Sequence, residues 1–324
     1  MSSRILVEAL NAALHQEMQK DTRVIVLGED VGKDGGVFRV TDKLLEKFGD
    51  KRCMDTPLAE SAIVGTAIGL AAAGLRPVVE IQFAGFLYGA LDQLMNHASR
   101  LRWRSRGRFS CPLVVRSPYG AGVRALEHHS ESMEALFAHI PGLKVVIPAT
   151  PYDAKGLLVS AIRDPDPVIF LEPTRVYRAI REEVPDEEYI IPLGKAQIVQ
   201  EGTDVTVIAW GAMVRDVKKA VDGIKEKYSV EIMNLRTVSP LDTETIVSSV
   251  KKTGRCVIVH EAPRTGGLGA EVSAQIMEKA LLYLEAPVER VTGFDTVVPL
   301  AQLEKQYLPD EKRIIKAIER VMQF

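Results

Sequence analysis

Short, continuously apolar segments alternate with helix-like segments along the first half of the chain. Strands that are apolar on both sides indicate a sheet that is covered on both faces. Their alternation with helices is typical of parallel sheets. We therefore expect an α/β fold whose first, parallel sheet is built from the segments at residues 24–27, 77–83, 113–116, 145–147 and 168–171.

This alternation stops in a charged, proline-containing stretch and then restarts. Residues 180–202 include the run Arg-Glu-Glu-Val-Pro-Asp-Glu-Glu, which is typical of a linker or a long surface connection. After it, strand-like and helix-like segments alternate again to the end of the chain. A length of 324 residues also exceeds the usual limit for one hydrophobic core. The sequence predicts a domain at residues 1–180, a linker at 181–202 and a smaller α/β domain at 203–324.

Charge and composition argue against several classes of partner. The formal net charge is -2, so no global positive field attracts nucleic acid or an anionic membrane. The chain has no apolar run long enough to span a bilayer, and its first residues do not resemble an export signal. The three cysteines are far apart, which argues against a disulfide framework and structural zinc. We expect a cytoplasmic chain that binds neither nucleic acid nor membrane.

The most informative single residue is Glu60. It lies near the start of a predicted, almost wholly apolar helix at residues 58–75, for which Thr56 is the expected N-cap. A carboxylate in a first turn is stabilised by the helix dipole, which is one interpretation. The other is that the helix carries one carboxyl group into a dry interface, where it can hold or share a proton. Gly65 and Gly69 would let another backbone approach this helix closely.

Two further segments carry polar or aromatic side chains at the ends of predicted strands. A glycine-containing loop follows Arg116 and delivers His128 and His129, which could be surface residues, metal ligands or acid–base groups. Gln82 and Phe86 follow another strand and could offer a hydrogen bond and an aromatic face to a planar ligand. Simple core packing is the alternative for Phe86.

Taken together, these segments resemble the β subunits of the thiamine-diphosphate-dependent pyruvate and branched-chain 2-oxo acid dehydrogenases. The similarity extends over essentially the whole chain. It includes the stretches at residues 27–32, 35–38, 55–60, 80–83, 141–146, 151–158 and 234–242. The resemblance implies a transketolase-like pyrimidine-binding domain followed by a transketolase C-terminal domain.

The same resemblance implies half of an active site. In this family an α subunit holds the diphosphate and Mg²⁺ through a G-D-G motif, and this sequence contains no G-D-G. Glu60 would hydrogen-bond the aminopyrimidine ring of the cofactor, while Gln82 and Phe86 would help to bind it. His129 would act in the transfer of the acyl group to lipoamide.

The family also implies partners and a metal ion. We expect a heterotetramer of two α and two β subunits with a β–β contact, and docking of the dihydrolipoyl acyltransferase core on the C-terminal domain. Some relatives bind potassium in the loop that matches Ala161, Asp164 and Asp166. The expected substrate is pyruvate or a branched-chain 2-oxo acid. The rival functions are a non-catalytic scaffold or docking subunit and a self-sufficient transketolase-type enzyme.

Overall fold

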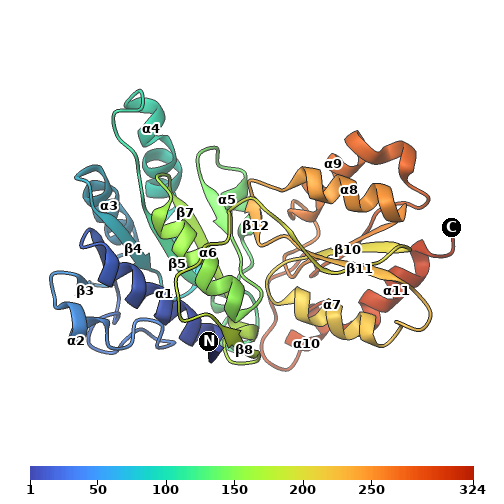
Figure 1. Cartoon of the computed structure of the whole chain (residues 1–324), viewed down its shortest axis with the longest axis horizontal. Coiled ribbons are helices and arrows are strands. Elements are labelled where there is room, and N and C mark those ends of the chain that lie inside the picture. Colours follow the sequence, from blue (N-terminus) through green and yellow to red (C-terminus); the bar gives the residue numbers. More distant parts are fainter.

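The computed structural model describes residues 1–324 and contains two main sheets, which lie side by side in Figure 1. The larger sheet has the strand order β12-β6-β7-β5-β4-β2-β3. Its strands are parallel except for the edge strand β12. The strands are β2 (Val24–Gly28), β3 (Cys53–Asp55), β4 (Arg76–Glu80), β5 (Val114–Tyr119), β6 (Lys144–Val146), β7 (Val168–Pro173) and β12 (Thr237–Ser239).

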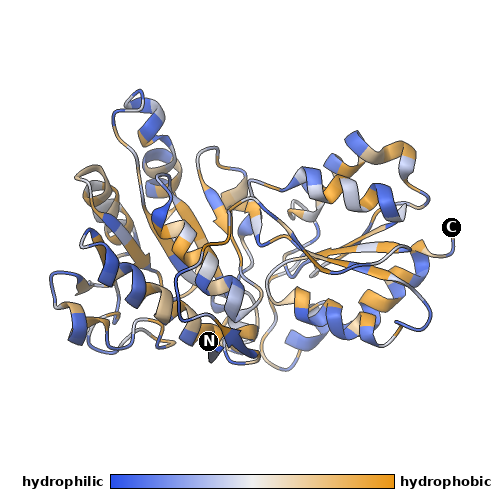
Figure 2. Ribbon diagram, in the orientation of Figure 1, coloured by the Kyte–Doolittle hydropathy of each residue, from blue (hydrophilic) through white to orange (hydrophobic).

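Helices cover both faces of this sheet because its strand residues are apolar on both sides. Val24 and Val26 point toward α1 and α6, whereas Ile25 and Leu27 point toward α3, α5 and the 3₁₀ helix η1. Figure 2 shows the hydrophobic residues concentrated in the strands. None of the helices combines the length and apolar content that a membrane span requires. The helices are α1 (Leu6–Lys20), α2 (Leu44–Phe48), α3 (Glu60–Ala72), η1 (Ala84–Ala90), α5 (Glu134–Ala138) and α6 (Pro151–Arg163).

The second sheet has the order β14-β13-β10-β11-β9, and only β9 is antiparallel. Its strands are β9 (Gln197–Gln200), β10 (Val205–Ala209), β11 (Val230–Asn234), β13 (Cys256–Val259) and β14 (Glu289–Val291). Helices α8 and α9 cover one face, and α7 and α11 cover the other (Figure 1). The helices of this half are α7 (Met213–Asp222), α8 (Thr243–Thr253), α9 (Gly269–Ala280), α10 (Glu304–Tyr307) and α11 (Glu311–Val321). The expected two-part α/β architecture is thus confirmed.

The two sheets are joined by a shared core and by buried polar contacts. A single apolar cluster includes Ile169 of the first sheet and Ile258 of the second. Asp153 on α6 is buried and accepts hydrogen bonds from Asn234 Nδ2 at 2.9 Å and from Arg236 Nε at 2.8 Å. The residues that follow Arg236 form β12, which pairs antiparallel with β6 of the first sheet. The sheets are therefore held in a fixed relation to one another.

The structure differs from the sequence prediction at the start of α3. This helix begins at Glu60, and Ala59 is its N-cap, so the prediction that Thr56 caps it is wrong. Instead, the Thr56 N–H donates to the carbonyl of Gly28 at 3.0 Å. Residues 56–59 therefore form an irregular connection that leads from the end of β3 to the helix.

After β4, residues 84–104 do not form one continuous α-helix. The structure has in its place the 3₁₀ helix η1, a π-helical turn (Gln93–His97), a 3₁₀ turn (Ala98–Arg100) and α4 (Leu101–Arg104). At the start of η1, any side chain at Gly85 would collide with the carbonyl oxygen of His128. In the sequence between the last helix-flanked strand of the first domain, β7, and the first strand of the second sheet, β9, the short strand β8 (Arg181–Val184) pairs with β1 (Ser2–Ile5).

A buried ionic cluster links three adjacent strands of the larger sheet. The Arg116 guanidinium on β5 donates to Glu172 on β7 at 2.7 and 3.0 Å and to Glu80 on β4 at 2.8 Å. The hydroxyl of Tyr177 donates to Glu172 at 2.6 Å. All four side chains are buried. Burial raises the pKa of Glu80, and the neighbouring Arg116 charge opposes this effect.

Replacement of Arg116 by alanine should destabilise the fold strongly. Two buried carboxylates would lose their counter-ion, and we expect the free energy of unfolding to fall by about 3–5 kcal/mol. Arg102→Ala is the matched control, because its pair with Asp166 is partly exposed and contributes less than about 1 kcal/mol. Urea unfolding followed by fluorescence measures both. Equal, small effects of the two substitutions would contradict this assignment.

Candidate active site

The predicted site residues follow neighbouring strands at one edge of the larger sheet. Glu60 follows β3, Gln82 and Phe86 follow β4, and His129 follows β5. These strands are parallel and occupy adjacent or nearly adjacent positions in the order β5-β4-β2-β3. Ligands of open α/β sheets bind outside the carboxyl ends of the strands, where such loops meet.

The structure brings the histidine pair onto the aromatic residues that follow β4. The ring centroid of His129 lies 4.2 Å from that of Phe83 and 5.5 Å from that of Phe86. His128 lies 5.4 Å from Phe86 and has no comparable contact with Phe83. The tight packing at Gly85 holds the His128 backbone against η1. His129 is therefore the more enclosed of the two histidines.

This enclosure changes the acid–base properties of His129. Burial lowers the pKa of its imidazole, and the neighbouring His128 lowers it further. Nδ1 is buried and has no hydrogen-bond partner in the chain. The ring is therefore neutral at pH 7, with one nitrogen able to accept a proton and the other able to donate one.

Glu60 lies on a hollow of about 590 Å³, together with residues of α3 and of the segment after β4. Its Oε2 atom lies 4.0 Å from the position that a Cβ atom would take at Gly89. Gly89 is three residues after Phe86 on η1, and residues at this spacing lie on the same side of a 3₁₀ helix. The Glu60 carboxyl group and the Phe86 ring are thus brought to one side of η1.

Sequence reasoning missed one carboxylate of this site, Glu29. It follows β2, is 7% exposed, and its Oε1 atom has no hydrogen-bond partner. Burial raises the pKa of Glu29, and the charge of Glu60 raises it further. The sequence signal that could have identified Glu29 as a site residue is its position directly after a buried strand.

Gln82 is held by a neighbouring strand end. Its Nε2 atom donates to Asp30 Oδ2 at 2.9 Å, and Asp30 follows β2 just after Glu29. The side chain is half-buried. This bond fixes Gln82 at the same edge of the sheet as Glu60 and Phe86.

Comparisons with known proteins identify the family of this chain. The family models for the transketolase pyrimidine binding domain and the transketolase C-terminal domain match residues 5–179 and 194–314. The pyruvate dehydrogenase E1 component subunit beta of Acholeplasma laidlawii is 56% identical over 98% of this chain and 97% of the relative. That of Bacillus subtilis (strain 168) is 51% identical over the full length of both. This chain belongs to the E1 β-subunit family of thiamine-diphosphate-dependent 2-oxo acid dehydrogenases.

The fold of this E1 β chain is also similar to that of a more distant solved structure. It is described as "Split gene transketolase, inactive beta4 tetramer" and covers 99% of both chains with a TM-score of 0.81. The identity is 24%, so the similarity concerns the fold.

The residues of the site fit one half of a thiamine diphosphate pocket. A carboxyl group, an aromatic ring and a histidine lie together at the sheet edge. Two of the buried polar atoms there, Glu29 Oε1 and His129 Nδ1, have no partner in this chain. Buried polar groups are normally hydrogen-bonded, so a ligand or a second chain is expected to complete the site.

The oxygen atoms of the loop expected to bind potassium have hydrogen-bond donors within this chain. The Asp164 carboxylate accepts from Lys144 Nζ at 2.5 Å, and the Asp166 carboxylate accepts from Arg102 Nε at 2.6 Å. The carbonyl of Ala161 accepts from the Asp164 N–H at 3.2 Å. Each of these three groups thus has at least one donor in this chain, and the potassium site stays a prediction.

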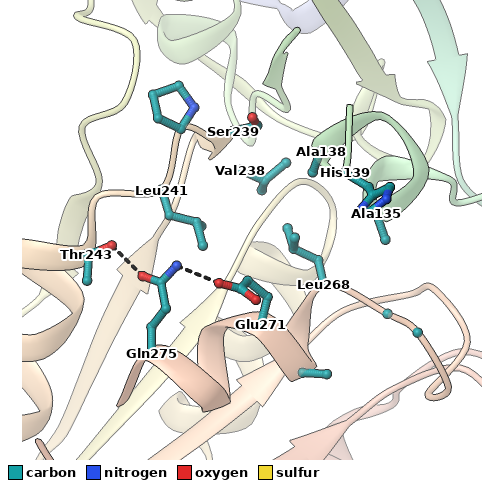
Figure 3. A pocket seen from close by; sticks show the side chains of 14 residues that line it. Ala135, Ala138, His139, Val238, Ser239, Leu241, Thr243, Leu268, Glu271 and Gln275 are labelled. Carbon is teal, nitrogen blue, oxygen red and sulfur yellow. Dashed lines mark hydrogen bonds between the residues drawn. The ribbon is translucent and has the colours of Figure 1, made fainter. Parts of the chain in front are cut away.

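A separate cavity of about 680 Å³ lies between α5 and α9 (Figure 3). Thr243 donates to Gln275, and Gln275 Nε2 donates to Glu271 at 2.8 Å. None of the predicted site residues lines this cavity. This cavity is therefore distinct from the hollow beside Glu60.

We expect the pKa of His129 to lie below its ordinary value of 6.5 and to rise toward it in Phe83→Ala, because that substitution opens the ring to water. NMR titration of the imidazole signals measures both values. Phe109→Ala is the control, since Phe109 is exposed and has no contact with the histidine pair. A pKa of His129 above 6.5 in the unmodified chain would refute this description.

Proposed function

We propose that this chain is the β subunit of a pyruvate dehydrogenase E1, which decarboxylates the 2-oxo acid and passes the acyl group to lipoamide. The single observation that carries the proposal is that η1 has the Glu60 carboxyl group beside Gly89 and the His129 ring beside Phe86. Pyruvate is favoured over branched-chain 2-oxo acids by the names of the relatives that are 56% and 51% identical.

Thiamine diphosphate, when bound, supplies the nucleophilic carbon and the electron sink that decarboxylation requires. The Glu60 carboxyl group would hydrogen-bond the pyrimidine ring of the bound cofactor. Phe86 presents its face to that ring, and Gln82 supplies a polar contact from the adjacent strand end. His129, neutral at pH 7, exchanges a proton at an imidazole nitrogen during acyl transfer to the lipoyl group.

The active enzyme is proposed to be a heterotetramer of two α and two β subunits in which the α subunit holds Mg²⁺ and the diphosphate. This proposal is supported by the absence of a G-D-G motif and by surfaces suited to contact with other chains. Leu58 and Trp103 are 78% and 75% exposed, and the outer side of α3 carries the small residues Ala62 and Gly69. Large exposed apolar side chains are typical of interfaces.

The second domain is proposed to dock the dihydrolipoyl acyltransferase core. The support is a group of exposed apolar side chains in this half of the chain, among which Leu282 is 95% exposed. The others are Met277, Leu281, Tyr283 and Phe324.

Glu60→Gln in the assembled α–β enzyme should lower the rate of pyruvate decarboxylation by at least about 100-fold, because the amide cannot hold an acidic proton. Glu271→Gln is the matched control, since Glu271 lies on the separate cavity, and its activity should be unchanged. The rate is measured with an artificial electron acceptor, with pyruvate and with a branched-chain 2-oxo acid.

Near-normal decarboxylation by Glu60→Gln would favour a scaffold or docking role. Binding of thiamine diphosphate and Mg²⁺ to the isolated chain, measured by calorimetry, would favour a self-sufficient transketolase-type enzyme. A higher rate with the branched-chain acid would reassign the substrate.

A further inference from the structure

The histidine pair lies on a closed loop between β5 and α5. The Gly120 N–H donates to the carbonyl of Glu131 at 2.9 Å, which joins the two ends of the loop. His129 lies near the second end, in a 3₁₀ turn (Glu127–His129). A displacement of the loop ends would therefore move His129 relative to Phe86.

The first end of this loop is held by two carboxylates of the second domain. The Ala121 N–H donates to Glu261 Oε2 at 3.1 Å, and the Gly122 N–H donates to Glu304 Oε2 at 3.1 Å. Both glutamates are buried, with 3% and 5% exposure. Hydrogen bonds from backbone N–H groups to buried carboxylates are stronger than those between neutral groups.

Packing around these bonds leaves the loop little freedom. Ala121 belongs to a small apolar cluster with Val298, Tyr307 and Leu308 of the second domain. Gly122 has a φ of +116°, and a side chain there would collide with Arg175.

Arg175 fixes one of these anchoring carboxylates. Its Nη1 atom donates to Glu261 at 3.3 Å, and its Nη2 atom donates to Asp216 at 2.7 Å. Arg175 follows β7 of the first sheet, whereas both carboxylates belong to the second half of the chain. The ion pairs therefore hold the two halves together beside the loop.

The second end of the loop is also tied to the second domain. Glu134, the first residue of α5, is completely buried and accepts from the indole Nε1–H of Trp210 at 3.1 Å. Trp210 stacks on His260, with ring centroids 5.2 Å apart and planes inclined by 13°. Both ends of the loop that carries His129 thus depend on residues 204–324.

We infer that the second domain positions the His129 loop and that Glu304 and Glu261 are positioning residues for acyl transfer. This inference rests on the proposed role of His129. Glu60, Gln82 and Phe86 lie on first-domain segments, and their hydrogen bonds do not involve these carboxylates. Loss of the anchoring bonds should therefore impair acyl transfer to lipoamide more than decarboxylation.

The test compares two half-reactions of the assembled α–β enzyme. Decarboxylation is followed with an artificial electron acceptor, and acyl transfer is followed as reductive acylation of a lipoyl domain. In Glu304→Ala, we expect the ratio of acyl transfer to decarboxylation to fall on the order of 10- to 100-fold, because small displacements of a catalytic group have effects of this size. Glu304→Gln should largely restore the ratio, since the amide oxygen can still accept from Gly122.

Two further variants complete the design. In Gly122→Ala, the added methyl group collides with Arg175 and displaces the backbone at residue 122, so the ratio of acyl transfer to decarboxylation should fall in the same way. This variant tests the inference if Glu304→Ala does not assemble with the α subunit. Glu226→Ala removes an exposed carboxylate of the same domain and should leave the ratio unchanged.

An equal loss of both half-reactions in Glu304→Ala, or no loss in either, would overturn the inference. Failure of Glu304→Gln to restore the ratio would also overturn it. These outcomes are distinct from failure of the proposed function, which shows as near-normal decarboxylation in Glu60→Gln whatever the Glu304 variants do.

Discussion

The guanidinium of Arg116 lies buried between Glu80 and Glu172, and this ionic cluster supports the segments that carry Gln82, Phe86 and His129. Its three residues belong to the adjacent strands β4, β5 and β7. The segment after β4 carries Gln82 and Phe86, the loop after β5 carries His129, and the turn after β7 carries Arg175. A charge cluster that needs all three partners therefore fixes the relative positions of the site and of its anchor to the second domain.

Much of this arrangement could be predicted from the sequence. Continuous apolar strands such as those around Ile25 and Val115 are buried on both faces, so their pattern indicates a covered parallel sheet without any tertiary information. In a parallel sheet the loops after successive strands meet at one edge, and this brings Phe86 and His129 together.

The remaining features depend on contacts between distant segments. The raised pKa of Glu29 depends on its burial and on the charge of Glu60, and neither position in the sequence predicts that proximity. The close approach of Gly85 to His128 joins two distant segments, and the N–H of Thr56 bonds to the carbonyl of Gly28 instead of Thr56 capping α3. The dependence of the His129 loop on Glu304 joins segments 182 residues apart, which no local pattern reveals.

The structure of the assembled α–β enzyme with thiamine diphosphate bound is the most direct test of the central claim that Glu60 acts on the cofactor. The decisive measurement is the distance from the Glu60 carboxyl group to the nearest pyrimidine nitrogen. We predict a hydrogen-bond distance of about 2.6–3.2 Å in a site closed by the α subunit. A Glu60 side chain that faces bulk water, with the cofactor beyond its reach, would contradict the proposed function.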